Sequence, residues 1–217
     1  PDLHTAIRRQ RQMCIRDINT MEVQAHGNYF EDIKTREITG MSKDEYDNLK
    51  DNGYTSSMDI VKGLYSDRDI SIKTAKSKKV DCGDILRRRA ETEYDIIIGL
   101  WNQVGDTKVF HTEYTFHIKP EHESLLWGKM TYEKLREFDN YIKSIPEGRT
   151  AQQDTKVERQ VLKTITEDAD AQMKIHPKVD SKKQRRVQCS FNIDRLIKAG
   201  VEYLSLIHIS EPTRHLL

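Results

Sequence analysis

A near-continuous apolar run, YDIIIGLW at residues 94–101, constrains the fold more than any other stretch of this chain. Such a run is typical of a strand buried on both faces, because a strand with one wet face alternates apolar and polar residues. The next stretch, residues 108–118, does alternate and so predicts a half-exposed strand. The apolar side chains expected on its buried face are Phe110, Tyr114, Phe116 and Ile118. The chain therefore needs a layer on each side of a central sheet.

The first part of the chain carries signals for two helices and one pair of strands. Residues 21–37 predict a helix. Ser42 to Glu45 form a capping-box pattern for a second helix, which we expect to stop at Asn52-Gly53. Residues 59–73 predict two short strands joined by a polar turn at Ser66-Asp67-Arg68.

Helices dominate the rest of the chain. Asp84 is the expected cap of a short helix, ILRRRAE. A second helical stripe consists of Leu135, Phe138 and Ile142. A longer helix, from about residue 152 to 174 and ended by Pro177, is predicted from apolar residues at four-residue spacing: Val157, Val161, Ile165, Ala169 and Met173. A strand at residues 185–191 and a helix from Asn192 follow. This order predicts an α/β or α+β fold with a mixed central sheet and flanking helices.

Composition excludes several classes of protein. No apolar run approaches the roughly 20 residues that a membrane-spanning helix needs, so no membrane partner is expected. The 36 basic and 35 acidic residues nearly cancel, so any nucleic-acid interface must come from a local cluster. Cys82 and Cys189 lie far apart in the sequence and form neither a disulfide framework nor a CxxC metal site. We therefore expect a reducing, cytoplasmic location.

The two ends of the chain differ from the rest. Residues 8–17, RRQRQMCIRD, and residues 204–214, LSLIHISEPTR, resemble translations of the adapter DNA that is ligated to fragments in shotgun sequencing libraries. We therefore set residues 1–17 and 204–217 aside as non-native segments. Residues 18–203 are the expected natural fragment, from a metagenomic assembly.

The strand pair at residues 59–73 carries the polar side chains with the clearest chemical use. In its second strand three of them share one face: Asp69, Ser71 and Lys73. Asp59 lies on the partner strand. A carboxylate opposite a lysine suits phosphodiester cleavage, since the carboxylate holds Mg²⁺ and the lysine orients or deprotonates a water molecule.

This arrangement resembles the signature of the PD-(D/E)XK nuclease superfamily, the restriction-endonuclease-like enzymes. The resemblance extends over about residues 27–103. It implies that Asp59 is a ligand of Mg²⁺ and that Lys73 is the catalytic lysine. It also implies that Glu31 is the acid that many members carry on their first helix.

The sequence departs from the superfamily pattern at Ser71, where an Asp or Glu metal ligand is usual. Some restriction endonucleases of the superfamily carry Ser or Thr there, and an acid further along the chain takes its place. The candidates in this chain are Asp84, Asp69 and, less well placed, Glu91. Which of them completes the metal site is left open.

A second constellation lies towards the C-terminus. Five cations fall within residues 178–186 and are interleaved with Gln and Ser donors. Cations neutralise phosphates, and Arg and Gln also read base edges in the major groove. The candidate DNA-binding residues are Lys178, Lys182, Lys183, Arg185, Arg186 and Gln188. Residues 87–89 form another basic run, although a helix would splay its side chains around the axis.

These features predict a Mg²⁺-dependent endonuclease of restriction type, phage-encoded or from a restriction system, that acts on double-stranded DNA. We expect a single domain with a nuclease-like core at about residues 21–145 and a helical, basic part at about 146–203. Two alternatives stay open: a catalytically inactive DNA-binding protein on the same scaffold, and a helical protein-interaction module built on the 152–174 helix. A homodimer is a further open alternative.

Overall fold

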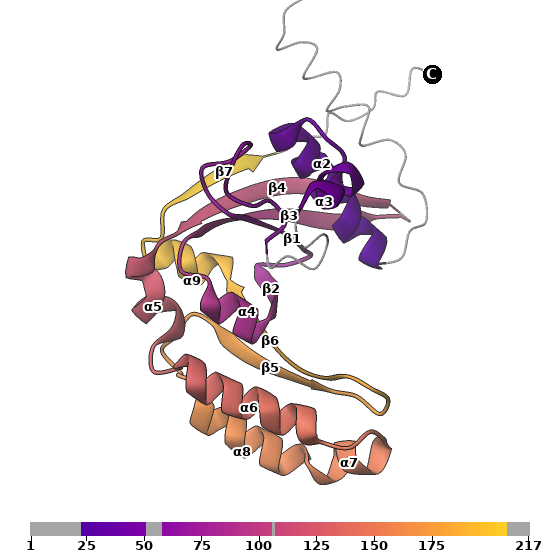
Figure 1. Ribbon diagram of the computed structural model, residues 1–217, viewed down its shortest axis with the longest axis vertical. Coiled ribbons are helices and arrows are strands. Elements are labelled where there is room, and N and C mark those ends of the chain that lie inside the picture. The colour runs from indigo at the N-terminus through magenta and orange to yellow at the C-terminus, as the bar shows by residue number, and fades with distance from the viewer. Residues whose placement is uncertain (1–22, 51–57, 106, 208–217) are drawn as a thin grey trace, which may run out of the picture.

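The computed structural model describes residues 23–50, 58–105 and 107–207, and its fold is mixed α/β as predicted (Figure 1). A four-stranded sheet has the strand order β1-β3-β4-β7. Its strands are β1 Ile70–Ala75, β3 Tyr94–Val104, β4 Thr107–Ile118 and β7 Tyr203–Ile207. β1 runs parallel to β3, and the other neighbours are antiparallel. The run at 94–101 lies in β3 and is buried on both faces: Ile96, Ile97 and Ile98 are at most 7% exposed.

A second, antiparallel sheet joins segments that are far apart in the sequence. Its strands, in the order β2-β6-β5, are β2 Lys79–Asp84, β6 Arg185–Asn192 and β5 Lys174–Val179. β6 confirms the strand predicted at 185–191. Pro177, which we expected to end a helix, instead lies within β5. The edge position of β5 explains this, because a proline on an edge strand removes no hydrogen bond from the interior of the sheet.

The helices form layers around the two sheets (Figure 1). Helices α2 and α3 cover one face of the four-stranded sheet, and α4 and α9 lie between the two sheets. Helix α6 packs against β6 of the three-stranded sheet and also contacts α4 and α8. The bounds are α2 Val23–Thr39, α3 Lys43–Leu49, α4 Ile85–Ala90, η2 Pro120–His122, α5 Glu123–Trp127, α6 Tyr132–Ser144, α7 Arg149–Asp154, α8 Lys156–Thr166 and α9 Ile193–Lys198.

Two helix starts follow the predicted capping chemistry. Ser42 Oγ accepts from the N–H of Glu45 at 3.2 Å, and Glu45 Oε2 accepts from the N–H of Ser42 at 2.8 Å, which is the predicted capping box. Asp84 caps α4. The predicted stop at Asn52-Gly53 lies outside the described residues.

Apolar side chains form one cluster on each face of the four-stranded sheet. The smaller cluster lies under α2 and α3 and consists of Phe30, Tyr46, Ile60, Ile70, Ile72 and Ile97. The larger cluster continues from the other face of this sheet into the three-stranded sheet and α6. It includes Ile98 and Phe116 from the first sheet, Val187 from the second, and Leu135, Phe138 and Ile142 from the predicted stripe on α6.

The prediction for β4 was wrong in one respect. Phe116 and Ile118 belong to the larger cluster, but the ring of Phe110 stacks on Phe30 in the smaller one, with 4.8 Å between centroids. The pairing of β3 with β4 shifts between Leu100 and Trp101, which leaves one extra residue in β4. Such a bulge reverses the alternation, so Phe110 points to the opposite face.

The long helix predicted at 152–174 was also wrong. The chain forms two shorter helices, α7 and α8, and α8 ends at Thr166. Asp168 closes the turn that follows, because its carboxylate accepts from the N–H groups of Lys129 and Asp170 at 2.8 and 3.0 Å. The chain then enters β5. Met173 is buried directly before that strand, so its apolar character reflects the core of the sheet.

No helix in the described part of the chain is long and apolar enough to cross a membrane.

The packing predicts that two isoleucines in neighbouring helices contribute very differently to the free energy of unfolding. Ile142 in α6 is 0% exposed, whereas Ile165 in α8 is 73% exposed. Ile142→Ala should lower the free energy of unfolding by about 2–5 kcal/mol, through lost burial and a residual cavity. Ile165→Ala is the matched control and should change it by less than about 0.5 kcal/mol. Urea denaturation of both variants measures the difference, and equal losses would contradict the packing described above.

Candidate active site

The candidate site forms along the free edge of β1, an outer strand of the four-stranded sheet. The residues before β1 turn back onto it, so that the N–H groups of Asp59 and Ile60 donate to the carbonyl of Ile70 at 2.9 and 3.0 Å. The N–H of Ile70 donates to the carbonyl of Ile60 at 2.7 Å. The first strand predicted at 59–73 is reduced to this bridge. The bridge nevertheless fixes Asp59 beside the strand edge.

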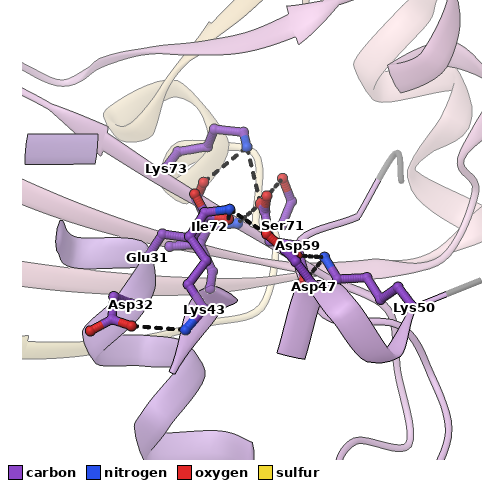
Figure 2. Close-up of polar contacts among 9 residues, drawn as sticks. All are labelled: Glu31, Asp32, Lys43, Asp47, Lys50, Asp59, Ser71, Ile72 and Lys73. Carbon is purple, nitrogen blue, oxygen red and sulfur yellow. Dashed lines mark hydrogen bonds and ion pairs between the residues drawn. The ribbon is translucent and has the colours of Figure 1, made fainter. Parts of the chain in front are cut away.

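The carboxylate of Asp59 takes the place of further strand pairing (Figure 2). Its Oδ2 accepts from the N–H of Ile72 at 2.5 Å, from Nζ of Lys73 at 3.2 Å and from Oγ of Ser71 at 3.4 Å. Nζ of Lys73 also donates to the carbonyl of Ile72 at 2.9 Å. Among the described residues these bonds to the Asp59 carboxylate all end on Oδ2. The other oxygen, Oδ1, takes part in none of them.

Glu31 is the acid that lies close to Asp59. It projects from α2, and its side chain is 18% exposed, with Oε1 at 3.2 Å from Nζ of Lys43. Burial raises the pKa of Glu31 to about 7, and repulsion from the Asp59 carboxylate adds to the rise. Lys43 and Lys73 oppose the shift. A cation bound beside both carboxylates would offset this repulsion and lower the pKa of Glu31.

Helix α3 and its C-cap residue, Lys50, add three charged residues that the sequence analysis did not select. Lys43 Nζ lies 2.6 Å from Asp47, and Lys50 Nζ lies 2.5 Å from Asp47. Lys50 Nζ also donates to the carbonyl of Asp59 at 2.8 Å. The positions 43, 47 and 50 fall on one face of a helix, and this spacing is the signal that would have identified them. These contacts connect α3 to both Glu31 and Asp59 (Figure 2).

Ser71 is placed between Asp59 and a buried arginine. Ser71 is 0% exposed, and its Oγ accepts from Nη2 of Arg88 at 2.9 Å. The guanidinium of Arg88 is itself buried, 4.6 Å from the ring centroid of Tyr94. Arg89 pairs with Glu123. The basic run at 87–89 is therefore splayed, as predicted for a helix.

The other acids proposed in place of a residue-71 ligand are engaged elsewhere. Oδ1 of Asp84 accepts from the N–H groups of Leu86 and Arg87, both at 3.0 Å, as the cap of α4. Oδ1 of Asp69 accepts from the N–H of Lys62 at 2.7 Å and closes the preceding loop. Glu31 is thus the acid that the structure brings to Asp59.

The basic segment at 178–190 forms the hairpin of β5 and β6. Arg185, proposed as a DNA contact, is occupied within the fold. Its Nε donates to the carbonyl of Ile145 at 2.9 Å, Nη1 donates to the carbonyl of Asp180 at 2.9 Å, and Nη2 donates to the carbonyl of Pro146. Its side chain is 7% exposed. The physical reason is register, since Arg185 faces the same side of the sheet as the buried Val179.

The donor set of the site fits Mg²⁺. This ion is usually held by one or two carboxylates, with water and substrate phosphates completing its shell. Asp59 and Glu31 supply two carboxylates. Within the described ranges, no group of three or more acidic, His or Cys side chains is placed to hold a metal. Two carboxylates match the number that a Mg²⁺ ion with water and substrate phosphates in its shell usually takes from the protein.

The raised pKa of Glu31 predicts a pH-dependent stability in the absence of divalent metal. The folded state holds this proton more tightly than the unfolded chain, so the stabilisation is complete below about pH 4.5 and is lost as pH rises through about 7. Glu31→Gln should therefore be more stable than the parent by about 1–2 kcal/mol near pH 8, after allowance for solvent screening and for the lost pair with Lys43.

Urea denaturation in EDTA across this pH range measures the effect. The advantage of the Gln variant should vanish near pH 4, and excess Mg²⁺ should stabilise the parent near pH 8 more than the variant. An advantage that is independent of pH would contradict a shifted Glu31.

Comparisons of the chain with protein-family models, with curated proteins and with solved structures give no significant match.

Proposed function

We propose that this protein is a Mg²⁺-dependent endodeoxyribonuclease of restriction type that hydrolyses phosphodiester bonds in double-stranded DNA. The observation that carries the proposal is the pair of Asp59 and Lys73, with 3.2 Å between Oδ2 and Nζ. The partly buried Glu31, whose pKa is raised by burial and then by Asp59, supplies a second carboxylate beside it. The resemblance to the PD-(D/E)XK pattern assigns these same three residues to metal binding and catalysis.

The residues of the chain have separate tasks in this reaction. Bound Mg²⁺ supplies a Lewis acid that polarises the phosphate and makes water more acidic. Asp59 and Glu31 are the carboxylates that would hold the ion. Nζ of Lys73 orients the attacking water and offsets the negative charge that develops on the phosphate. Because Ile72 and Asp59 already hold Nζ, the ammonium needs little reorganisation before the reaction. The resemblance implies a product with a 5′-phosphate.

Substitution of the central pair tests the proposal. Asp59→Ala and Lys73→Ala should each reduce Mg²⁺-dependent cutting of plasmid or phage DNA by at least about a hundredfold. Gel electrophoresis of the digests measures the loss, and circular dichroism checks that both variants fold.

Asp67→Ala and Lys76→Ala are the matched controls, because both residues are exposed and lie close in sequence to the site. They should cut like the parent. Undiminished cutting by either Asp59→Ala or Lys73→Ala would refute the assignment.

One feature favours a second candidate, a DNA-binding protein without catalytic activity. Ser71 stands where the superfamily pattern has an acid, and its hydroxyl is bound to Arg88. The two candidates differ in metal binding. Isothermal titration with Mg²⁺ should show binding by the parent that Asp59→Ala removes, if the protein is a nuclease. DNA binding without any Asp59-dependent affinity for Mg²⁺ would favour the inactive scaffold.

Helix α8 favours a third candidate, a module for protein interaction that includes self-association. Val157, Val161 and Ile165 form an apolar stripe on its surface and are 75%, 51% and 73% exposed. If this stripe is an interface between copies, the parent should associate with rising concentration and Val161→Asp should abolish the association.

Light scattering after size-exclusion chromatography measures the mass. Gln160→Asp places the same charge on an exposed neighbour outside the stripe and should leave the mass unchanged. A parent that is monomeric at all concentrations would count against self-association through α8.

A further inference from the structure

The three-stranded sheet has one polar face, built from residues that the sequence does not group together. On β5 and β6 the paired residues of this face are His176 with Gln188 and Lys178 with Arg186. On β2, Lys79 and Asp81 pair with Asn192 and Ser190 of β6. The residues between them belong to the larger apolar cluster: Ile175, Val179, Val187, Cys189 and Phe191. The sheet thus has one face against the core and one polar face, on which Lys79 and Arg186 are exposed and Ser190 is buried.

The polar face carries cations from all three strands. Lys79, Lys178 and Arg186 form no ion pair with any described residue, and Lys79 and Arg186 are exposed. Lys182 and Lys183 are exposed in the turn that joins β5 to β6. Two acids lie nearby, Asp81 on β2 and Asp180 in the turn. Asp180 is partly occupied, because its Oδ1 accepts from the N–H groups of residues 182 and 184.

The pKa of His176 indicates the sign of the electrostatic field on the polar face. Its Nε2 lies 2.7 Å from Oγ of Ser190. Burial lowers the pKa of His176, and the cations Lys79, Lys163 and Lys178 lower it further, while Asp81 opposes them. The field around the imidazole is therefore positive on balance. A bound anion is the ligand that such a field stabilises.

We propose that this polar face of β2, β5 and β6 binds the phosphate backbone of a DNA duplex. Lys79, Lys178 and Arg186 pair with phosphates. Gln188 donates to phosphate and sugar oxygens, which hold register without reading sequence. Lys182 and Lys183 extend the contact at the hairpin turn. This surface excludes Arg185 and adds Lys79 and His176 to the basic segment that the sequence indicated.

The inference rests on the proposed nuclease function, and the connectivity supports the link. β2 follows β1 after a turn of three residues, so Lys79 is six residues beyond Lys73 on one continuous segment. β1 and β2 are in contact, and β2 joins the four-stranded sheet to the second sheet (Figure 1). A duplex held on the polar face is thus bound by the segment that also carries the catalytic lysine.

A binding measurement on uncut DNA tests the proposal separately from catalysis. In the Asp59→Asn background, anisotropy of a labelled duplex is measured across a range of salt concentrations. Lys178→Glu with Arg186→Glu should weaken binding at least about tenfold and reduce the slope of log K against log salt by about 2. The matched control is Lys134→Glu with Arg136→Glu, an equal change of charge on exposed residues of α6, and should bind nearly like the background protein.

Further arms make each outcome decisive. Lys178→Gln with Arg186→Gln repeats the test with a milder change if the Glu variant fails to fold. NMR titration of His176 should show its pKa rising when duplex is added. Binding that is equal in face and control variants overturns the proposal, as does tighter binding of single-stranded RNA. If Asp59→Asn still cuts DNA while the face variants lose binding, the nuclease site is wrong and the DNA-binding face stands.

Discussion

The closing of the β1 edge by a carboxylate is the interaction on which the candidate site depends. An edge strand presents unpaired N–H and C=O groups, and another strand usually takes them. Here Asp59 accepts from the N–H of Ile72, while Lys50 takes the carbonyl of Asp59. Backbone pairing therefore stops after one bridge. The Asp59 carboxylate is held against β1 next to Lys73. The strand edge therefore fixes the positions of both the carboxylate and the Lys73 ammonium.

The serine at position 71 is explained by the arginine behind it. A buried guanidinium is costly unless its charge is compensated, and no described carboxylate pairs with Arg88. Arg88 rests instead on the ring of Tyr94 and donates to Oγ of Ser71. The hydroxyl thereby accepts from Arg88 and donates to Asp59. An acid at this position would form an ion pair with Arg88. The serine instead links Arg88 to Asp59 through two hydrogen bonds, at the position where the superfamily pattern has a metal ligand.

Local patterns in the sequence predict some of these features because their causes are local. The buried run in β3, the capping box at Ser42 and the cap at Asp84 each depend on a few adjacent residues. The proximity of Asp59 and Lys73 follows from a short chain reversal. A local pattern does not show that Glu31, and not Asp84, lies beside Asp59. That placement depends on how α2 packs across the sheet.

Local sequence patterns also do not predict the second sheet, because its strands are far apart in the sequence. β2 pairs with β6, and the intervening chain contains the whole of β3, β4 and α6. The face of Arg185 follows from its pairing with Val179, and a basic run in sequence does not reveal that register.

The fold also separates two groups of cations. Lys43, Lys50 and Lys73 surround carboxylates and neutralise them, so they add little net field. Within the described part of the chain, Lys79, Lys178 and Arg186 on the polar face form no such ion pair, so the positive field is concentrated there.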